Sequence, residues 1–220
     1  MNFRKKNIVA KLLILVSATL VIVSCSTKKN NFVNRKYHNT TAKYNGYFNG
    51  NESLKAGIKK LEENHKDDFS EIIPVFKTGD LAKNQTIHPY MNKAIEKGSI
   101  VIQRHSMNIR GKEYNKWIDD NYFMIGKSYF YKGEFDEAIK TFNYIKETYK
   151  RNPLKYDAAL WLARCFSEKE DYVAAEMELD QLQTDRKFPE KLDDELAVIL
   201  ADFYLKQENY ILALDEMNTA

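Results

Sequence analysis

Glycine and proline are scarce in this chain, which has 8 glycines and 4 prolines among 220 residues. An all-β sandwich needs turn-forming residues between its many short strands, so this composition argues against one. The two cysteines are too few for a scaffold built on disulfides. An excess of one charge is missing as well. Of 34 basic residues four fall in the acid-free segment 1–24, and the rest nearly balance 31 acidic residues. The body therefore lacks the broad basic surface of a nucleic-acid-binding protein, and no nucleic-acid partner is expected.

A hydrophobic run long enough to cross a membrane is also missing. Residues 12–23 are apolar and follow a basic N-terminus, but a helix of this length spans only ~18 Å of a ~30 Å hydrocarbon core. The pattern is typical of a secretory signal peptide.

The signal peptide ends in Ile22-Val23-Ser24-Cys25, which resembles the lipobox of bacterial lipoproteins. This resemblance implies that residues 1–24 are removed, that Cys25 is lipidated, and that 25–34 form a tether. An ordinary signal peptide with an incidental cysteine is the alternative. Ser26 follows the cysteine in place of an aspartate, and residues 27–30 contain no acid. These features favour an outer-membrane anchor facing the periplasm.

The body contains a repeated pattern of helical spacing. A small residue at Gly126, Ala163 or Ala201 is followed three residues later by an aromatic, then by a turn, and then by a second small residue. The three small residues lie 37 and 38 positions apart, close to the period of about 34 of tetratricopeptide repeats. The sequence therefore resembles an all-α chain of helical hairpins stacked as an α-solenoid. The expected repeats span about 119–153, 156–189 and 194–220, within a region covering 113–220, and the last is truncated.

Upstream of the repeats the pattern is looser. Residues 35–66 are predicted to form a Tyr/Asn-rich helical hairpin with its turn at Asn49, Gly50 and Asn51. Residues 67–88 contain Pro74 and Gly79 without a clear period, and are predicted to be a connector. Residues 89–112 are predicted to form a helix, begun by Pro89, and a loop.

No arrangement of residues typical of catalysis or metal binding is found in the sequence. The four histidines lack the spacing of three or four that would place two on one helix face, and are predicted to be surface or capping residues: His38, His65, His88 and His105. Cys165 lies in an apolar stretch and is predicted to be a buried core residue. The sequence therefore predicts a non-enzymatic protein without cofactor, metal or small-molecule substrate.

Binding of protein partners is the expected activity. In tetratricopeptide arrays the first helix of each hairpin lines a concave groove, which suits a peptide or a partner helix. The repeat positions predict the following lining residues: Asp120, Phe123, Lys127, Tyr131, Asp157 and Arg164.

Three stretches together resemble the N-terminal part of one family, the PorW/SprE lipoproteins of Bacteroidota. They are Cys25–Asn30, the Tyr/Asn-rich segment 44–51 running into 65–69, and Asn115-Lys116-Trp117-Ile118-Asp119-Asp120. The resemblance implies a lipid-anchored outer-membrane scaffold that binds proteins of the type IX secretion and gliding machinery. It also implies that the native protein continues past Ala220. The apolar residues of 210–217 then predict that the last helix exposes an apolar surface that tends to associate.

Two other functions remain open from the sequence. One is an outer-membrane assembly lipoprotein like BamD, which is also a tetratricopeptide protein of comparable length. The other is a glycan-binding lipoprotein of nutrient uptake. The Tyr/Asn-rich segment favours the first family over BamD, and a glycan site would need aromatic platforms on long loops, of which residues 67–88 are the one candidate.

Overall fold

The computed structural model describes residues 26–70, 72–77 and 85–219. The described chain is mostly helical with almost no strand, so the predicted all-α class is confirmed. Cys25 and the apolar segment 12–23 lie outside the described residues. The elements are α2 (Phe32–Thr41), the π-helical η1 (Ala42–Tyr47), α3 (Phe48–Asn64), the short 3-10 helix η2 (Gln85–Ile87), α4 (His88–His105), β1 (Asn108–Ile109), β2 (Lys112–Glu113), α5 (Ile118–Tyr131), α6 (Phe135–Thr148), α7 (Leu154–Glu168), α8 (Tyr172–Thr184), the 3-10 helix η3 (Glu190–Leu192), α9 (Asp193–Lys206) and α10 (Tyr210–Thr219).

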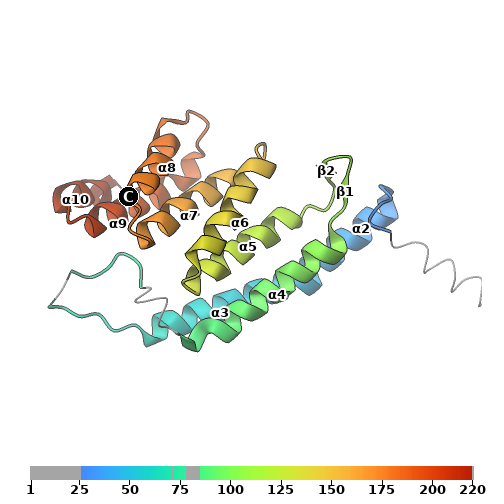
Figure 1. Ribbon diagram of the computed structural model, residues 1–220, viewed down its shortest axis with the longest axis horizontal. Coiled ribbons are helices and arrows are strands. Elements are labelled where there is room, and N and C mark those ends of the chain that lie inside the picture. The colour runs from blue at the N-terminus through green and yellow to red at the C-terminus, as the bar shows by residue number, and fades with distance from the viewer. Residues whose placement is uncertain (1–25, 71, 78–84, 220) are drawn as a thin grey trace, which may run out of the picture.

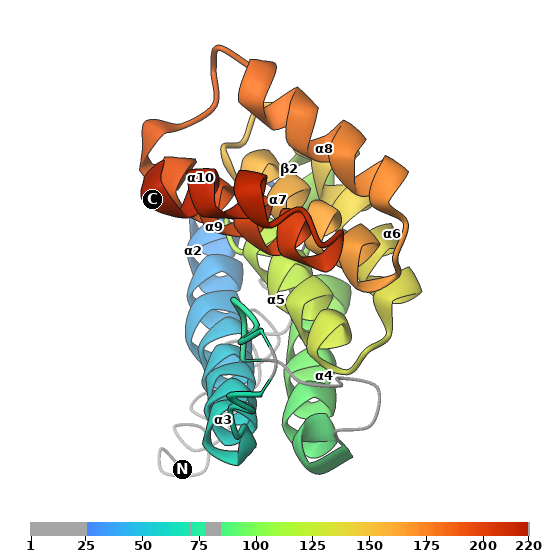
Figure 2. The same cartoon turned by 90° about the vertical axis from the view of Figure 1, so that its left-hand side faces the viewer.

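The helices pack in chain order. Each of α3 to α7 contacts the next helix along the chain, α9 packs on α10, and α7 also contacts both α5 and α9. Figure 1 shows α3 and α4 side by side along one edge, with the later helices stacked beyond them. The view in Figure 2 shows α9 and α10 crossing the end of that stack.

The predicted N-terminal hairpin is wrong. The chain stays helical without a break from Phe32 to Asn64 and has no turn at Gly50. Gly50 instead provides close packing: a Cβ there would lie 2.6 Å from Met124 Cε and 3.3 Å from Lys97 Cβ. Gly46 in η1 likewise faces Val101 of α4. Gly50, which suggested a turn, and Gly46 thus let the long helix lie against α4, which is its real antiparallel partner.

The segments on either side of α4 differ in how well they match the prediction. Pro89 lies in the first turn of α4, as predicted. The described parts of the connector contain no helix until Gln85. The loop predicted after α4 contains a two-stranded antiparallel hairpin in which Ile109 pairs with Lys112. Arg110 and Gly111, with φ of 54° and 78°, form its turn.

Each of the three predicted repeat segments contains two helices joined by a short turn. The second residue after the first helix of each pair adopts positive φ: 75° at Gly133, 60° at Glu170 and 60° at Glu208. The next residue donates its N–H to a carbonyl five residues back in all three turns, at 3.0 Å, 2.9 Å and 2.9 Å. This is the Schellman ending of a helix, and it recurs with the same geometry in all three pairs.

The core is built where small residues face large ones. A Cβ at Gly126 of α5 would lie 2.7 Å from Phe142 Cε1 on α6, and Phe142 is fully buried.

Cys165 is buried as predicted, and burial raises the pKa of its thiol. The last helix, α10, exposes an apolar side as expected: Tyr210, Ile211, Leu212, Leu214 and Met217. No helix within the described residues is both long enough and apolar enough to span a membrane.

A histidine pair joins α2 to α4, with His38 buried and His105 half-buried, so the prediction of surface histidines is wrong for His38. His38 is 3% exposed, and its Nδ1 lies 2.9 Å from Nδ1 of His105. One nitrogen must donate and the other accept, so two charged imidazoles cannot make this contact. Burial lowers the pKa of both rings, and for His105 the charges of His38 and Arg104 lower it further.

Stability is expected to depend on pH through this pair. Because both folded-state pKa values lie below the model-peptide value of 6.5, the unfolded chain binds more protons, and stability present above about pH 6.5 is lost as pH falls below it. His105→Gln should flatten the dependence of the melting temperature on pH between about 7.5 and 5.5. His65→Gln, a control at the C-terminal end of α3, should keep the slope of the parent chain. Equal slopes for all three proteins would contradict the assignment.

The close contact at Gly126 gives a second prediction. Gly126→Leu should lower the free energy of unfolding by about 1–3 kcal/mol, because the added atoms collide with the fixed ring of Phe142. Ala56→Leu on the exposed side of α3 is the matched control and should change stability by about 0.5 kcal/mol or less. Urea denaturation measures both. A Gly126→Leu protein as stable as the control would mean that α5 and α6 do not approach this closely.

Candidate binding surface

The predicted lining residues come from two helices that lie side by side. Asp120, Phe123, Lys127 and Tyr131 are on α5, and Asp157 and Arg164 are on α7. With Trp161 of α7 and Glu195 of α9 they form what we call the first-helix cluster. None is fully exposed: Tyr131 is 9% and Arg164 is 5% exposed.

The indole of Trp161 lies at the centre of this cluster. Lys127 Nζ lies 4.6 Å from its ring, and the guanidinium carbon of Arg164 lies 4.3 Å from it. Phe123 and Tyr131 pack against the same indole, with ring centroids 6.3 Å and 5.9 Å away. Both cations therefore lie against aromatic rings, and cation–π attraction partly compensates for the hydration that they lose on burial.

Burial and mutual charge shift the pKa values of the two α5 groups in the cluster. Burial lowers the pKa of Lys127, and Arg164 lowers it further, while Glu195 and Asp157 act in the opposite direction. Burial raises the pKa of Asp120 to about 6, helped by the charges of Asp119 and Asp157. The contributions of Asp157 and Arg164 show that α7 groups act on α5 across the helix boundary.

The acidic groups of α7 and α9 behave like Asp120. Burial raises the pKa of Asp157, against the charges of Lys191 and Lys127. Burial, then the charge of Asp157, raises the pKa of Glu195. Half-buried acids that lie close to one another and have raised pKa values destabilise the free chain. Such groups are typical of binding sites.

A second set of charged side chains lies further along α7 and α9, and its members form ion pairs with one another. Lys206 Nζ lies 2.7 Å from Glu168 Oε1 and 2.8 Å from Asp202 Oδ2. Burial alone would lower the pKa of Lys206, but the charges of Asp202 and Glu168 outweigh it and raise the pKa. These three groups bind one another and link α7 to α9.

Sequence reasoning missed two residues of this region. Trp161 falls between the repeat positions used to choose the lining residues, although tryptophan on a first helix was a usable signal. Phe76 lies in the connector, and its ring centroid is 3.9 Å from the guanidinium carbon of Arg164. Nothing periodic surrounds Phe76 in the sequence, so only the folded chain reveals this contact.

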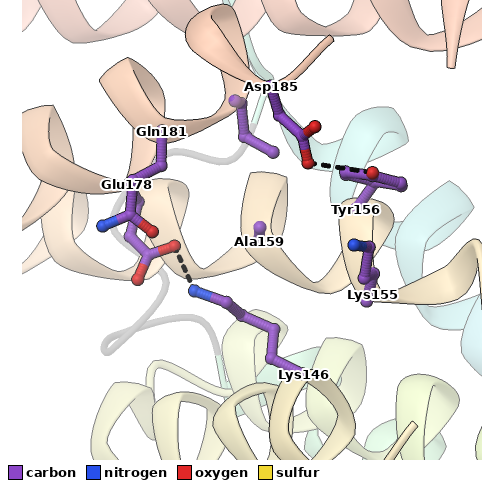
Figure 3. Close-up of a pocket in the computed structure, with 8 residues that line it drawn as sticks. Lys146, Lys155, Tyr156, Ala159, Glu178, Gln181 and Asp185 are labelled. Atoms are coloured by element: carbon purple, nitrogen blue, oxygen red, sulfur yellow. Dashed lines mark hydrogen bonds and ion pairs between the residues drawn. The ribbon is translucent and has the colours of Figure 1, made fainter. Parts of the chain in front are cut away.

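A cavity of about 150 Å³ lies away from the cluster, where α6, α7 and α8 meet (Figure 3). Lys146 forms an ion pair with Glu178 across it, and the Tyr156 hydroxyl donates a hydrogen bond of 2.9 Å to Asp185. In each pair the polar groups bind each other, and the two pairs connect α6, α7 and α8.

Among the described residues, no group of three or more histidine, cysteine, aspartate or glutamate side chains could hold a metal ion.

Comparison of the chain with protein-family models finds no match. Comparison with curated proteins finds none either. The first-helix cluster is therefore interpreted from its own chemistry. Its cations can pair with carboxylates or stack on rings, and its carboxylates can accept hydrogen bonds from peptide N–H groups or bind cationic side chains. This is an arrangement suited to binding.

The raised pKa of Asp120 gives a stability prediction. Because its folded-state pKa is about 6 against 3.8 for the model value, the parent chain loses stability as pH rises through that range. Asp120→Asn should therefore be more stable than the parent at pH 7.5, by roughly 1–2 kcal/mol after allowance for solvent screening. The difference should vanish below about pH 4.

Denaturation at several pH values measures this difference. Asp193→Asn is the matched control, since Asp193 is an exposed acid in the first turn of α9 and its replacement should change little. An Asp120→Asn protein that is less stable than the parent at pH 7.5 would show that the carboxylate is stabilised where it lies.

Proposed function

We propose that this chain is a lipid-anchored, periplasm-facing scaffold of the outer membrane that binds proteins of the type IX secretion and gliding machinery. Binding would occur through tetratricopeptide-like repeats, with the first-helix cluster as the contact surface. Cys25 would carry the lipid. The resemblance of the Tyr/Asn-rich N-terminal segment to the PorW/SprE lipoproteins suggests the machinery.

The observation that carries the binding role is the recurrence of one turn in three helix pairs. Gly133, Glu170 and Glu208 share a positive φ, and each precedes a residue that makes the same hydrogen bond. Recurring hairpins of this kind place successive first helices next to one another, and α7 indeed contacts α5 and α9. A surface assembled from three such helices suits an extended peptide or a helix of a partner.

Capture of partners from crosslinked cells tests the proposal. The double variant Lys127→Glu/Arg164→Glu should recover at least about tenfold less of the partner proteins, since central charged and aromatic contacts carry most of the binding energy of an interface. The matched control is Lys60→Glu/Lys150→Glu, which reverses two exposed charges outside the cluster. It should capture partners like the parent chain.

Circular dichroism must show that both double variants keep their helicity, because Arg164 is buried. Mass spectrometry then identifies the captured proteins. Capture of the general barrel-assembly machine without secretion components would overturn the proposal in favour of a BamD-like role. Undiminished capture by the cluster variant would move the contact surface elsewhere.

A further inference from the structure

The connector between α3 and α4 places one aromatic side chain on the first-helix cluster. Phe76 is half-buried, and it packs against the apolar cluster formed by α7, α8 and α9. Of the other apolar side chains between His65 and Lys77, Phe69 is 83%, Ile72 is 58% and Ile73 is 44% exposed, and Val75 is half-buried. Phe76 is the aromatic side chain through which this segment reaches the first-helix cluster.

The partner of Phe76 is a cation with little access to water. Arg164 is 5% exposed, and its guanidinium carbon lies 4.3 Å from the ring of Trp161 and 4.9 Å from that of Phe130. Phe76 adds a third ring at 3.9 Å. A guanidinium surrounded by rings gains cation–π attraction from each of them, and more when water is excluded. The place occupied by Phe76 is thus a position where an aromatic ring is favoured.

The backbone at this position belongs to no helix or strand. Residues 72–74 have no regular structure and 75–77 form a bend and a turn, and Figure 1 shows the connector leaving the end of α3 and turning back towards the later helices. An irregular segment that exposes most of its apolar side chains is ordered at an entropic cost that its few contacts offset only in part. Such a contact can be displaced by a second segment that brings the same ring.

The charges around the position indicate what should accompany that ring. Within the cluster the carboxylates of Asp120, Asp157 and Glu195 face the cations Lys127 and Arg164. At its edge Glu62 acts on Tyr131 and Lys191 acts on Asp157, so carboxylates outnumber cations by one. In the chain itself Phe76 is followed by Lys77. A basic residue next to the aromatic residue would complement the excess of carboxylates.

We propose that the guanidinium of Arg164, held by the rings of Trp161 and Phe130, forms a binding subsite for an aromatic side chain on an extended, basic segment of a protein partner, and that Phe76 fills this subsite in the free chain. The identification of the partner as a protein rests on the proposed function. The seating of Phe76 is a property of the chain alone.

A labelled peptide provides the test. The probe is a synthetic peptide of residues 69–77 with blocked ends, and fluorescence anisotropy measures its binding to the full chain in detergent. The Phe76→Ala chain should bind the peptide at least about tenfold more tightly than the parent, because a tethered ring competes at an effective concentration in the millimolar range. Phe69→Ala, which removes an exposed ring of the same connector, is the control and should bind like the parent.

Two further measurements identify the contact. A peptide with alanine at position 76 should not bind the Phe76→Ala chain. Replacing Arg164 by lysine in that chain should weaken binding of the parent peptide, since lysine keeps the charge and loses the planar stacking group. Equal affinity of the parent and Phe76→Ala chains would overturn the proposal, as would equal binding of the two peptides.

These outcomes are separate from those of the capture experiment. Equal binding of the peptide to the parent and Phe76→Ala chains would rule out the aromatic subsite, and partner capture through the cluster would remain possible. If the parent chain captures no secretion components from crosslinked cells, the proposed function is wrong, but the subsite can still bind the peptide.

Discussion

The stacking of charged and aromatic side chains on Trp161 connects the core of this protein to its surface. The same indole packs against Phe130 and Phe142 in the interior and against the ammonium of Lys127 and the guanidinium of Arg164, which is itself 5% exposed. The position of the cations is thus fixed by core packing between α5, α6 and α7. A change in the spacing of these helices would move the binding surface with them.

That spacing is set in turn by small residues facing large ones. Gly126 admits the ring of Phe142 between α5 and α6, and Ala163 and Ala175 are fully buried where α7 and α8 meet. The same constraint acts on the N-terminal helix, where Gly46 and Gly50 allow close approach of α4 and α5. One packing rule therefore governs both the repeated helix pairs and the long helix that precedes them.

The sequence predicted those features whose signals are periodic and local. The helices of 118–219, their turns and the burial of Cys165 follow from spacing and composition alone. Local reasoning failed at Gly50, which favours a turn by its own propensity but lies in a helix because α4 and Met124 need the space. It failed also at His38, whose partner His105 is 67 residues away, and at Phe76, whose contact with Arg164 depends on the path of the connector.

The central claim is that the connector's own Phe76 occupies the aromatic position on Arg164. Nuclear Overhauser spectroscopy tests it most directly, on the deuterated chain with protonated phenylalanine, arginine and tryptophan side chains. Cross-peaks between the Phe76 ring and the Arg164 side chain, absent in Phe76→Leu, are the predicted result, because the guanidinium carbon lies 3.9 Å from that ring. A spectrum in which Arg164 shows contacts to Trp161 and Phe130 but none to Phe76 would contradict the account.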